Sequence, residues 1–144
     1  MINGVTSMRT YKIVIVENDE DEQFFMKDGF EKAGGLFEIV AQVRNGDMLF
    51  EWLEEQNDSL PDVVLSDLNM PGMNGYDVIT GMKNDPRYGK IPVIITSTSS
   101  TPTIIDKCLG LGAADYLVKP ETWLEYTPFV QNLHRIIEEK KLVD

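Results

Sequence analysis

The sequence predicts an α/β domain, a doubly wound five-stranded parallel sheet with helices on both faces. Along the 144 residues, five short strand-like segments alternate with five stretches in which apolar residues recur at helical spacing. Several of the strand-like segments are apolar throughout, as expected of parallel strands covered on both faces. Because strand–helix–strand crossovers are right-handed, this alternation favours a doubly wound sheet, for which we expect the flavodoxin-like strand order 2-1-3-4-5.

The first three strands are predicted at residues 12–16, 37–43 and 62–66. Each is followed by a stretch in which apolar residues recur every three or four positions, the spacing that places them on one face of a helix. These apolar residues are Met26, Phe30 and Ala33 after the first strand, Leu49, Trp52 and Leu53 after the second, and Val78, Ile79 and Met82 in a helix near 75–84 after the third.

The fourth strand is predicted at residues 92–97 and the fifth at 114–118. Between them, Thr101 is a good N-cap and Pro102 suits the first turn of a helix. The apolar residues of that helix are Ile104, Ile105, Cys108 and Leu109. We expect Cys108 to lie in the core.

The last helix has two possible starts. Thr122 and Glu125 match a capping box, but Pro128 would then interrupt the helix interior. We therefore favour a short turn over residues 122–126, with Thr127 as the cap and Pro128 in the first turn. The core-facing residues of this helix are Val130, Leu133 and Ile137, and we expect His134 at the surface.

Composition limits the partners and the compartment. The net charge is −11, from 24 acidic and 13 basic residues, so the domain should repel nucleic acid and anionic membranes. Cys108 is the only cysteine and has no partner for an internal disulfide, which fits a reducing compartment. No segment approaches the ~18 apolar residues of a membrane span. We expect a cytoplasmic protein with a flexible N-terminal tail at residues 1–10.

Polar residues gather where the predicted strands end. Glu17, Asn18 and Asp19 follow the first strand, and Asp67 lies at the end of the third. In the expected strand order these two strands flank the topological switch point, where open α/β sheets bind ligands. Two further groups follow the fourth and fifth strands, namely Ser97 with Thr98, and Lys119 with Pro120.

This combination of side chains predicts a site for a hard cation and for covalent chemistry. Two carboxylates about 4 Å apart repel each other by ~4 kcal/mol at an effective dielectric constant near 20. Mg²⁺ relieves such repulsion and typically binds one or two carboxylates, water and phosphate oxygens. Asp67 is suited to attack phosphorus and form an acyl phosphate. The metal, Lys119 and a hydroxyl would offset the charge on the transferred group.

Three sequence motifs give a specific resemblance. D-L-N-M-P-G-M-N-G at 67–75, P-V-I-I-T-S-T at 92–98 and G-A-A-D-Y-L-V-K-P at 112–120 occur in this order. With them, residues 11–144 resemble a response-regulator receiver domain, similar to single-domain regulators of the chemotaxis type. The resemblance implies a stand-alone phosphoacceptor switch of two-component signalling, which catalyses only its own phosphotransfer and dephosphorylation and is not otherwise an enzyme.

The resemblance also implies roles for individual residues. Asp67 would accept a phosphoryl group from a histidine kinase or phosphotransfer protein, and the backbone carbonyl of Asn69 would bind Mg²⁺. Lys119 would pair with the phosphoryl group, ahead of a cis Lys119–Pro120 bond. Ser97 matches the switch hydroxyl, and Tyr116 matches the switch aromatic, whose ring we expect to move from exposed to buried. The downstream target would be a protein that binds the face formed by residues 101–142.

One position departs from the family pattern. Receiver domains usually carry two acidic residues after the first strand. Glu17 matches the first of them, but Asn18 occupies the second, with Asp19 as a further, indirect candidate ligand. An amide oxygen binds Mg²⁺ without adding charge, so we expect a working but weaker metal site. The alternative is a pseudo-receiver that accepts little or no phosphate and acts as an interaction module.

Two other classes use similar folds or residues. A haloacid-dehalogenase-like phosphatase also has a strand-end Asp nucleophile, but it needs a second acid two residues later, where this chain has Asn69. A flavodoxin-like flavin carrier needs a phosphate-binding loop rich in Ser, Thr and Gly after the first strand. The corresponding residues 17–22 are almost all acidic and would repel a flavin phosphate.

Overall fold

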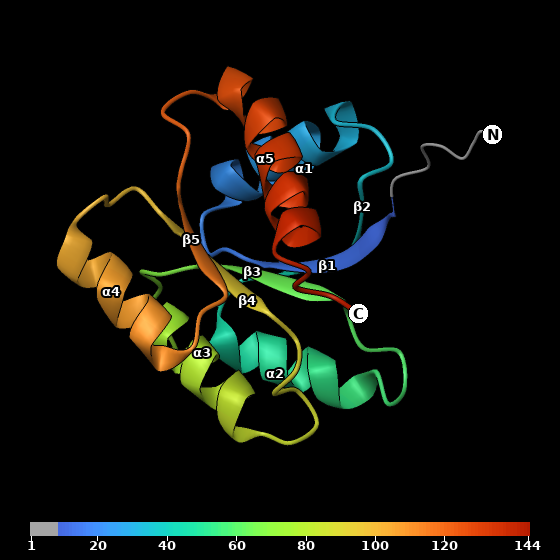
Figure 1. Ribbon diagram of the computed structural model, residues 1–144, viewed down its shortest axis with the longest axis vertical. Coiled ribbons are helices and arrows are strands. Elements are labelled where there is room, and N and C mark those ends of the chain that lie inside the picture. Colours follow the sequence, from blue (N-terminus) through green and yellow to red (C-terminus); the bar gives the residue numbers. More distant parts are fainter. Residues whose placement is uncertain (1–8) are drawn as a thin grey trace.

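Five parallel strands form one sheet in the computed structural model of the protein, which describes residues 9–144 (Figure 1). The strand order is β2-β1-β3-β4-β5, so the predicted topology is confirmed. The switch point lies between β1 and β3, which are neighbours in space although β2 separates them in the chain. The strands are β1 (Tyr11–Val16), β2 (Phe37–Val43), β3 (Val63–Asp67), β4 (Val93–Ser97) and β5 (Asp115–Val118).

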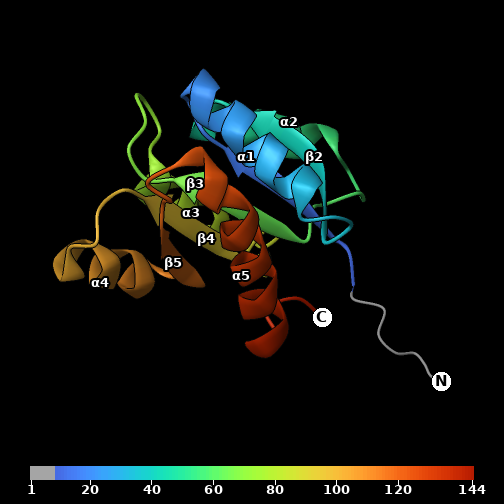
Figure 2. The same cartoon turned by 90° about the horizontal axis from the view of Figure 1, so that it is seen from above.

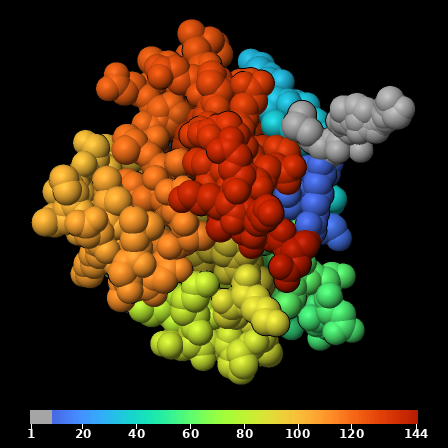
Figure 3. Space-filling model, in the orientation of Figure 1, coloured from blue at the N-terminus to red at the C-terminus, as the bar shows by residue number. Residues whose placement is uncertain are grey.

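Helices cover both faces of the sheet. One face carries α1 and α5, which pack against each other, and the other carries α2, α3 and α4 (Figures 1 and 2). In the space-filling view, the segment from α4 to α5, coloured orange to red, forms much of one side of the molecule (Figure 3). The helices are α1 (Glu20–Lys32), α2 (Gly46–Glu55), α3 (Gly75–Asn84), α4 (Pro102–Leu111) and α5 (Tyr126–Glu139), with a 3₁₀ turn η1 (Trp123–Glu125) before α5.

The core consists of two layers, one on each side of the sheet. Successive strand residues point to opposite faces. In β1, Ile13 and Ile15 therefore pack with α1 and α5, whereas Val14 and Val16 pack with α2 and α3. All four are fully buried. Cys108 is buried in the second layer, as the sequence predicts. The two layers hold the strand ends, and hence the polar residues that follow them, in fixed positions.

Side-chain caps start the helices next to this edge of the sheet. The Asp19 carboxylate accepts a hydrogen bond from the Glu22 N–H at 3.0 Å and begins α1. Asn45 caps α2 in the same way, and Asn74 forms a reciprocal capping box with Asp77 at α3. Such caps satisfy backbone donors that would otherwise lack partners. They also fix the short loops that connect strand ends to helices around the candidate site.

The start of α5 differs from the prediction. A short turn, η1, is present where we expected one, but the helix begins at Tyr126, so the choice of Thr127 as its cap is wrong. The Tyr126 hydroxyl donates a hydrogen bond to the Glu22 carboxylate on α1. Its Cβ also lies so close to Gly29 that a methyl group there would come within 2.7 Å of it. This packing against α1, rather than a local cap, determines where the helix starts.

The prediction for His134 is also wrong. The side chain is only 3% exposed and packs between the rings of Tyr11 and Phe37. Its Nε2 lies 2.8 Å from the Arg9 carbonyl oxygen. The segment before β1 therefore covers a face of α5 that the sequence pattern alone would leave open to solvent.

The expected N-terminal tail lies mostly at residues 1–8, outside the described residues. Arg9 and Thr10 contact the domain, and the Thr10 hydroxyl donates to the Gly35 carbonyl at 2.6 Å. Within residues 9–144, no helix is both long and apolar enough to cross a membrane.

Candidate functional site

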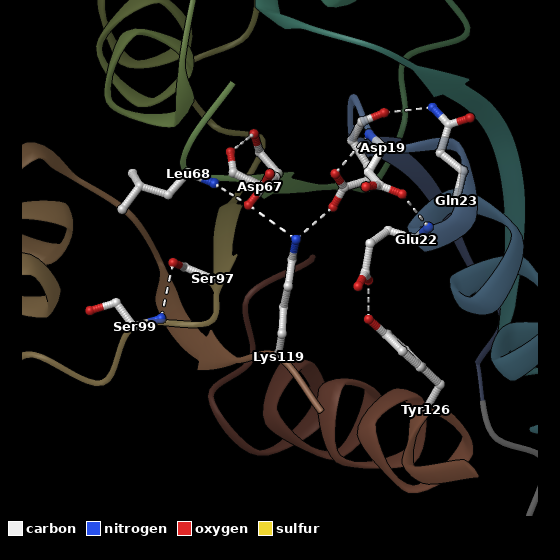
Figure 4. A network of polar contacts seen from close by, with 11 residues as sticks. Asp19, Glu22, Gln23, Asp67, Leu68, Ser97, Ser99, Lys119 and Tyr126 are labelled. Atoms are coloured by element: carbon white, nitrogen blue, oxygen red, sulfur yellow. Dashed lines mark hydrogen bonds and ion pairs between the residues drawn. The ribbon is translucent and has the colours of Figure 1, made fainter. Parts of the chain in front are cut away.

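Three strand ends bring Glu17, Asp67 and Lys119 together. Figure 4 shows the Lys119 side chain directed toward Asp67. The Lys119 ammonium lies 2.8 Å from Glu17 Oε1 and 3.3 Å from Asp67 Oδ1. Glu17 and Asp67 are 1% and 7% exposed, and the Lys119 side chain is 8% exposed. Because parallel strands end at the same edge of the sheet, residues that are far apart in the chain meet here.

The charges at this site do not balance. Two carboxylates face one ammonium, which leaves a net charge of about −1 in a region that excludes most water. Burial raises the pKa of the Glu17 carboxyl, and the nearby Asp67 charge adds to this effect, while Lys119 opposes it. Burial alone would lower the pKa of Lys119, but its hydrogen bond to Glu17 and the charge of Asp67 raise it overall. The site therefore favours an additional positive charge.

The Asp67 carboxylate is held by one of its two oxygens. Oδ1 accepts a hydrogen bond from the Leu68 N–H at 2.9 Å and is also the oxygen that faces Lys119. Within residues 9–144, no hydrogen bond reaches Oδ2. The backbone after Asp67 passes close to Gly75, where a Cβ would come within 2.8 Å of the Asp67 carbonyl oxygen. Asp67 thus has a fixed orientation and one oxygen available for chemistry.

The other predicted metal ligands lie at different depths. Asn18 is half-buried and lines a cavity of about 220 Å³ together with Arg44 and Met48. Asn69 is exposed, so its carbonyl lies in a solvent-facing loop. Asp19 is exposed and its side chain caps α1, while its N–H donates to Glu17 Oε2 at 3.1 Å.

These residues fit a hard cation that keeps much of its water. Within residues 9–144, no three or more His, Cys, Asp and Glu side chains are arranged to hold a metal. Glu17 and Asp67 are the two buried carboxylates at the site, and oxygen from an amide, a backbone carbonyl or water would have to supply the remaining ligands. Mg²⁺ commonly binds in this way, through one or two carboxylates and several waters.

Ser97 and Tyr116 are linked through Ser99. The Ser97 hydroxyl accepts a hydrogen bond from the Ser99 N–H at 3.2 Å. The Tyr116 hydroxyl donates to the Ser99 carbonyl at 2.7 Å. The Tyr116 ring is buried, with 8% of its surface exposed. We expected an exposed ring before phosphorylation, so the structure shows the buried position of the ring instead.

The Lys119–Pro120 bond is trans, as are all peptide bonds in residues 9–144, so the expectation of a cis bond is wrong for this structure. The trans form of such a bond is favoured by about 0.5–1 kcal/mol. The Lys119 N–H extends the sheet by donating to the Ser97 carbonyl at 2.8 Å. With this backbone geometry, the lysine side chain reaches both carboxylates.

Three residues join the site that the sequence did not single out. Gln23 Nε2 donates to the Glu17 carbonyl at 2.6 Å, and Glu22 accepts a hydrogen bond from Tyr126 (Figure 4). The negative charge of Glu22 also helps to raise the pKa of Lys119. Burial and this bond raise the pKa of the Tyr126 hydroxyl. No local motif marks these residues, because their contacts depend on how α1 packs against α5.

A doubly wound sheet with buried carboxylates after its first and third strands, and a lysine after its fifth, defines a receiver-type signalling domain. Residues 13–126 match the family described as response regulator receiver domain, and the chain belongs to this family. It is therefore a receiver domain of a response regulator in two-component signalling.

Relatives and solved structures of similar fold agree with this assignment. The two-component response regulator-like protein APRR7 of Arabidopsis thaliana is 31% identical over 113 residues, which are 78% of this chain and 15% of APRR7. Chemotaxis protein CheY1 of Helicobacter pylori is 29% identical over 77% of this chain and 86% of its own length. The phosphorylated cyanobacterial phytochrome response regulator RcpA has a TM-score of 0.77 at 27% identity, over 88% of this chain and 93% of RcpA.

Proposed function

We propose that the protein is a phosphoacceptor switch that receives a phosphoryl group on Asp67 from a histidine kinase or phosphotransfer protein. The observation that carries the proposal is the position of Asp67 at the end of β3. Its Oδ1 is held by Leu68 and Lys119, and its Oδ2 has no hydrogen bond from the residues that the structure describes. Receiver domains interact with such kinases, and the family membership of residues 13–126 supports the same class of donor here.

The proposed reaction transfers phosphorus from nitrogen to oxygen. Asp67 Oδ2 attacks the phosphorus of a phosphohistidine, the P–N bond breaks, and the leaving imidazole nitrogen takes up a proton. The product is an acyl phosphate on Asp67. Lys119 then pairs with the phosphoryl oxygens, which releases it in part from Glu17.

The proposed cofactor is Mg²⁺, held by Glu17 and Asp67 with oxygen from Asn18 and Asn69. When bound, it would neutralise the excess negative charge at the site and stabilise charge on the transferred phosphoryl group. Asp19 is a weaker candidate, because its carboxylate already caps α1.

The proposed output begins at Ser97. Its hydroxyl would turn from Ser99 to the phosphoryl oxygen and draw the loop after β4 inward, which changes the acceptor of the Tyr116 hydroxyl. The downstream partner would be a protein that reads residues 101–142, the continuous surface visible in Figure 3. The net charge of −11 argues against nucleic acid as that partner.

A specific observation supports one alternative. Asn18 stands where the family usually has an acid, and within residues 9–144 no group of three acidic, His or Cys ligands is present. A metal site too weak for phosphotransfer would leave a pseudo-receiver, an interaction module that does not depend on phosphate.

Incubation with acetyl phosphate and Mg²⁺, followed by intact-mass measurement, separates the two functions. The parent protein should gain one phosphoryl group, and Asp67→Asn should gain none. Asp62→Asn, just before the opposite end of the same strand, is the matched control and should be labelled like the parent. Absence of labelling in the parent, or equal labelling of Asp67→Asn, would reject the phosphoacceptor function.

A further inference from the structure

The Thr96 hydroxyl is a buried polar group without a hydrogen-bond partner in the part of the chain that the structure describes. The residue is fully buried in β4, between Ile95 and Ser97. Most buried hydroxyls in proteins have a partner, and each exception calls for an explanation. A valine would fill the same space, next to the apolar residues 93–95 of the strand, without an unsatisfied hydroxyl.

Strand register places Thr96 beneath the candidate site. Its neighbours across the sheet are Asp67 on β3 and Leu117 on β5. Ile94, two residues earlier, belongs to the core layer of α1 and α5, so alternation directs the Thr96 side chain to that face. Lys119 follows Leu117 by two residues, and its N–H continues the pairing with β4 by donating to the Ser97 carbonyl. Its side chain therefore starts from the same face as that of Thr96.

The Lys119 ammonium has an incomplete set of partners. An ammonium group carries three N–H donors. Its acceptors are Glu17 Oε1 at 2.8 Å and Asp67 Oδ1 at 3.3 Å (Figure 4). One N–H therefore has no acceptor among residues 9–144, and the ammonium is buried with an 8% exposed side chain. An unused donor and an unused acceptor lie on the same face of the same sheet edge.

We propose that Thr96 is a positioning residue for Lys119, whose third N–H its hydroxyl reaches through one buried water. This inference rests on the proposed function and identifies how the lysine is aimed. When Glu17 turns toward a metal and Asp67 takes up a phosphoryl group, the ammonium loses the partners that hold it. The Thr96 hydroxyl is neutral and belongs to the rigid strand, so it keeps the ammonium directed at the phosphoryl position throughout the reaction.

Two substitutions separate this role from a packing role. Thr96→Val keeps the shape and removes the hydroxyl, whereas Thr96→Ser keeps the hydroxyl and removes a methyl group. Phosphorylation of Asp67 by acetyl phosphate and Mg²⁺ should be slower in Thr96→Val by about tenfold to a hundredfold, the range for losing a hydrogen bond to a charged group. Thr96→Ser should stay close to the parent. Thr80→Val, whose hydroxyl bonds within its own helix, is the matched control for the substitution type.

Besides the phosphorylation rate, two further measurements are the unfolding temperature and the exchange of the Lys119 ammonium protons with water. Both substitutions should lower the unfolding temperature, Thr96→Val because it removes the acceptor that bridges to Lys119 and Thr96→Ser because it removes buried methyl contacts. Only Thr96→Val should also slow phosphorylation. In NMR spectra, the Lys119 ammonium protons should exchange with water faster in Thr96→Val than in the parent or in Thr96→Ser.

Each outcome decides the question. Slower phosphorylation and faster ammonium exchange in Thr96→Val, with both close to the parent in Thr96→Ser, support the proposal. An unchanged rate, an unchanged exchange, or a rate loss that follows stability across both variants overturns it. If the parent accepts no phosphate, the proposed function fails, and the exchange measurement alone then decides whether Thr96 holds the lysine.

Discussion

Lys119 Nζ lies 2.8 Å from Glu17 Oε1, which joins the ends of β5 and β1 across 102 residues of chain. Both side chains are almost completely buried. An ion pair in such a place offsets the cost of removing its charges from water only if each charge keeps its partners. Asp67 shares the same ammonium, so any event at Asp67 changes the balance between Glu17 and Lys119. The relationship underlies the first two predictions.

Replacing Glu17 should change how stability depends on pH. The pKa of Glu17 is raised in the folded state, so the folded protein binds this proton more tightly than the unfolded chain. Its contribution to stability is fully present below the unfolded pKa of about 4.3 and is lost as pH rises through the higher folded value. Glu17→Gln should lack this loss. Urea unfolding between pH 4 and 8 measures how the free energy of unfolding depends on pH, with the exposed Glu51→Gln as control. The same pH dependence in the parent and in Glu17→Gln would contradict a raised pKa for Glu17.

Restoring an acid at position 18 should strengthen metal binding. Asn18→Asp adds a negative charge to a site that already favours a cation, and we expect Mg²⁺ affinity to rise about tenfold, equivalent to ~1.4 kcal/mol. Glu17→Gln should weaken binding by a similar factor. Titrations followed by tryptophan or tyrosine fluorescence provide the measurement.

Asn45→Asp is the control for this metal prediction. Asn45 lines the same small cavity as Asn18 and caps α2, a role that Asp performs equally well. The substitution therefore adds the same charge nearby without placing it next to Glu17. If Asn45→Asp and Asn18→Asp raise the affinity equally, the effect is long-range attraction and Asn18 is not a ligand position.

Removing the Ser97 hydroxyl should uncouple phosphorylation of Asp67 from the structural change at residues 101–118. With beryllofluoride as the phosphoryl mimic, the parent should show NMR shift changes at residues 101–118, because Ser97 and Tyr116 both bond to Ser99. Ser97→Ala should still accept phosphate on Asp67 but show little change at those residues. Ser100→Ala, at a neighbouring exposed position, should respond like the parent. A full response in Ser97→Ala would show that the signal takes another route.

The contact between α1 and α5 should tolerate no added methyl group at Gly29. A Cβ at this position would come within 2.7 Å of Tyr126 Cβ and 3.1 Å of its backbone carbon, neither of which is a flexible chain end. Gly29→Ala should therefore lower the free energy of unfolding by about 1–3 kcal/mol despite its better helix propensity. Gly110→Ala, where a Cβ meets nothing within 4 Å, should instead raise it by about 0.5–1 kcal/mol. Denaturant unfolding of both variants tests the contrast.

Local sequence patterns were sufficient to predict the parallel sheet and the positions of its strands. The apolar run at residues 14–16 is fully buried, as expected of a parallel strand covered on both faces, and the helix predicted near 75–84 is present as α3. The strand order follows from right-handed crossovers, which is why β1 and β3 could be placed side by side in advance. The meeting of Glu17, Asp67 and Lys119 followed from that order.

The sequence by itself determined the class of fold and the edge of the sheet where the charged groups meet, because both depend on short-range periodicity and general rules of chain connection. Only the tertiary structure decided the rest. Tyr126, and not Thr127, starts α5 because it packs on Gly29, and His134 is buried because the segment at Arg9 covers it. The unsatisfied hydroxyl of Thr96 likewise emerges only from the register of three strands. Contacts between distant segments have no local signature, since they depend on how whole helices and strands pack.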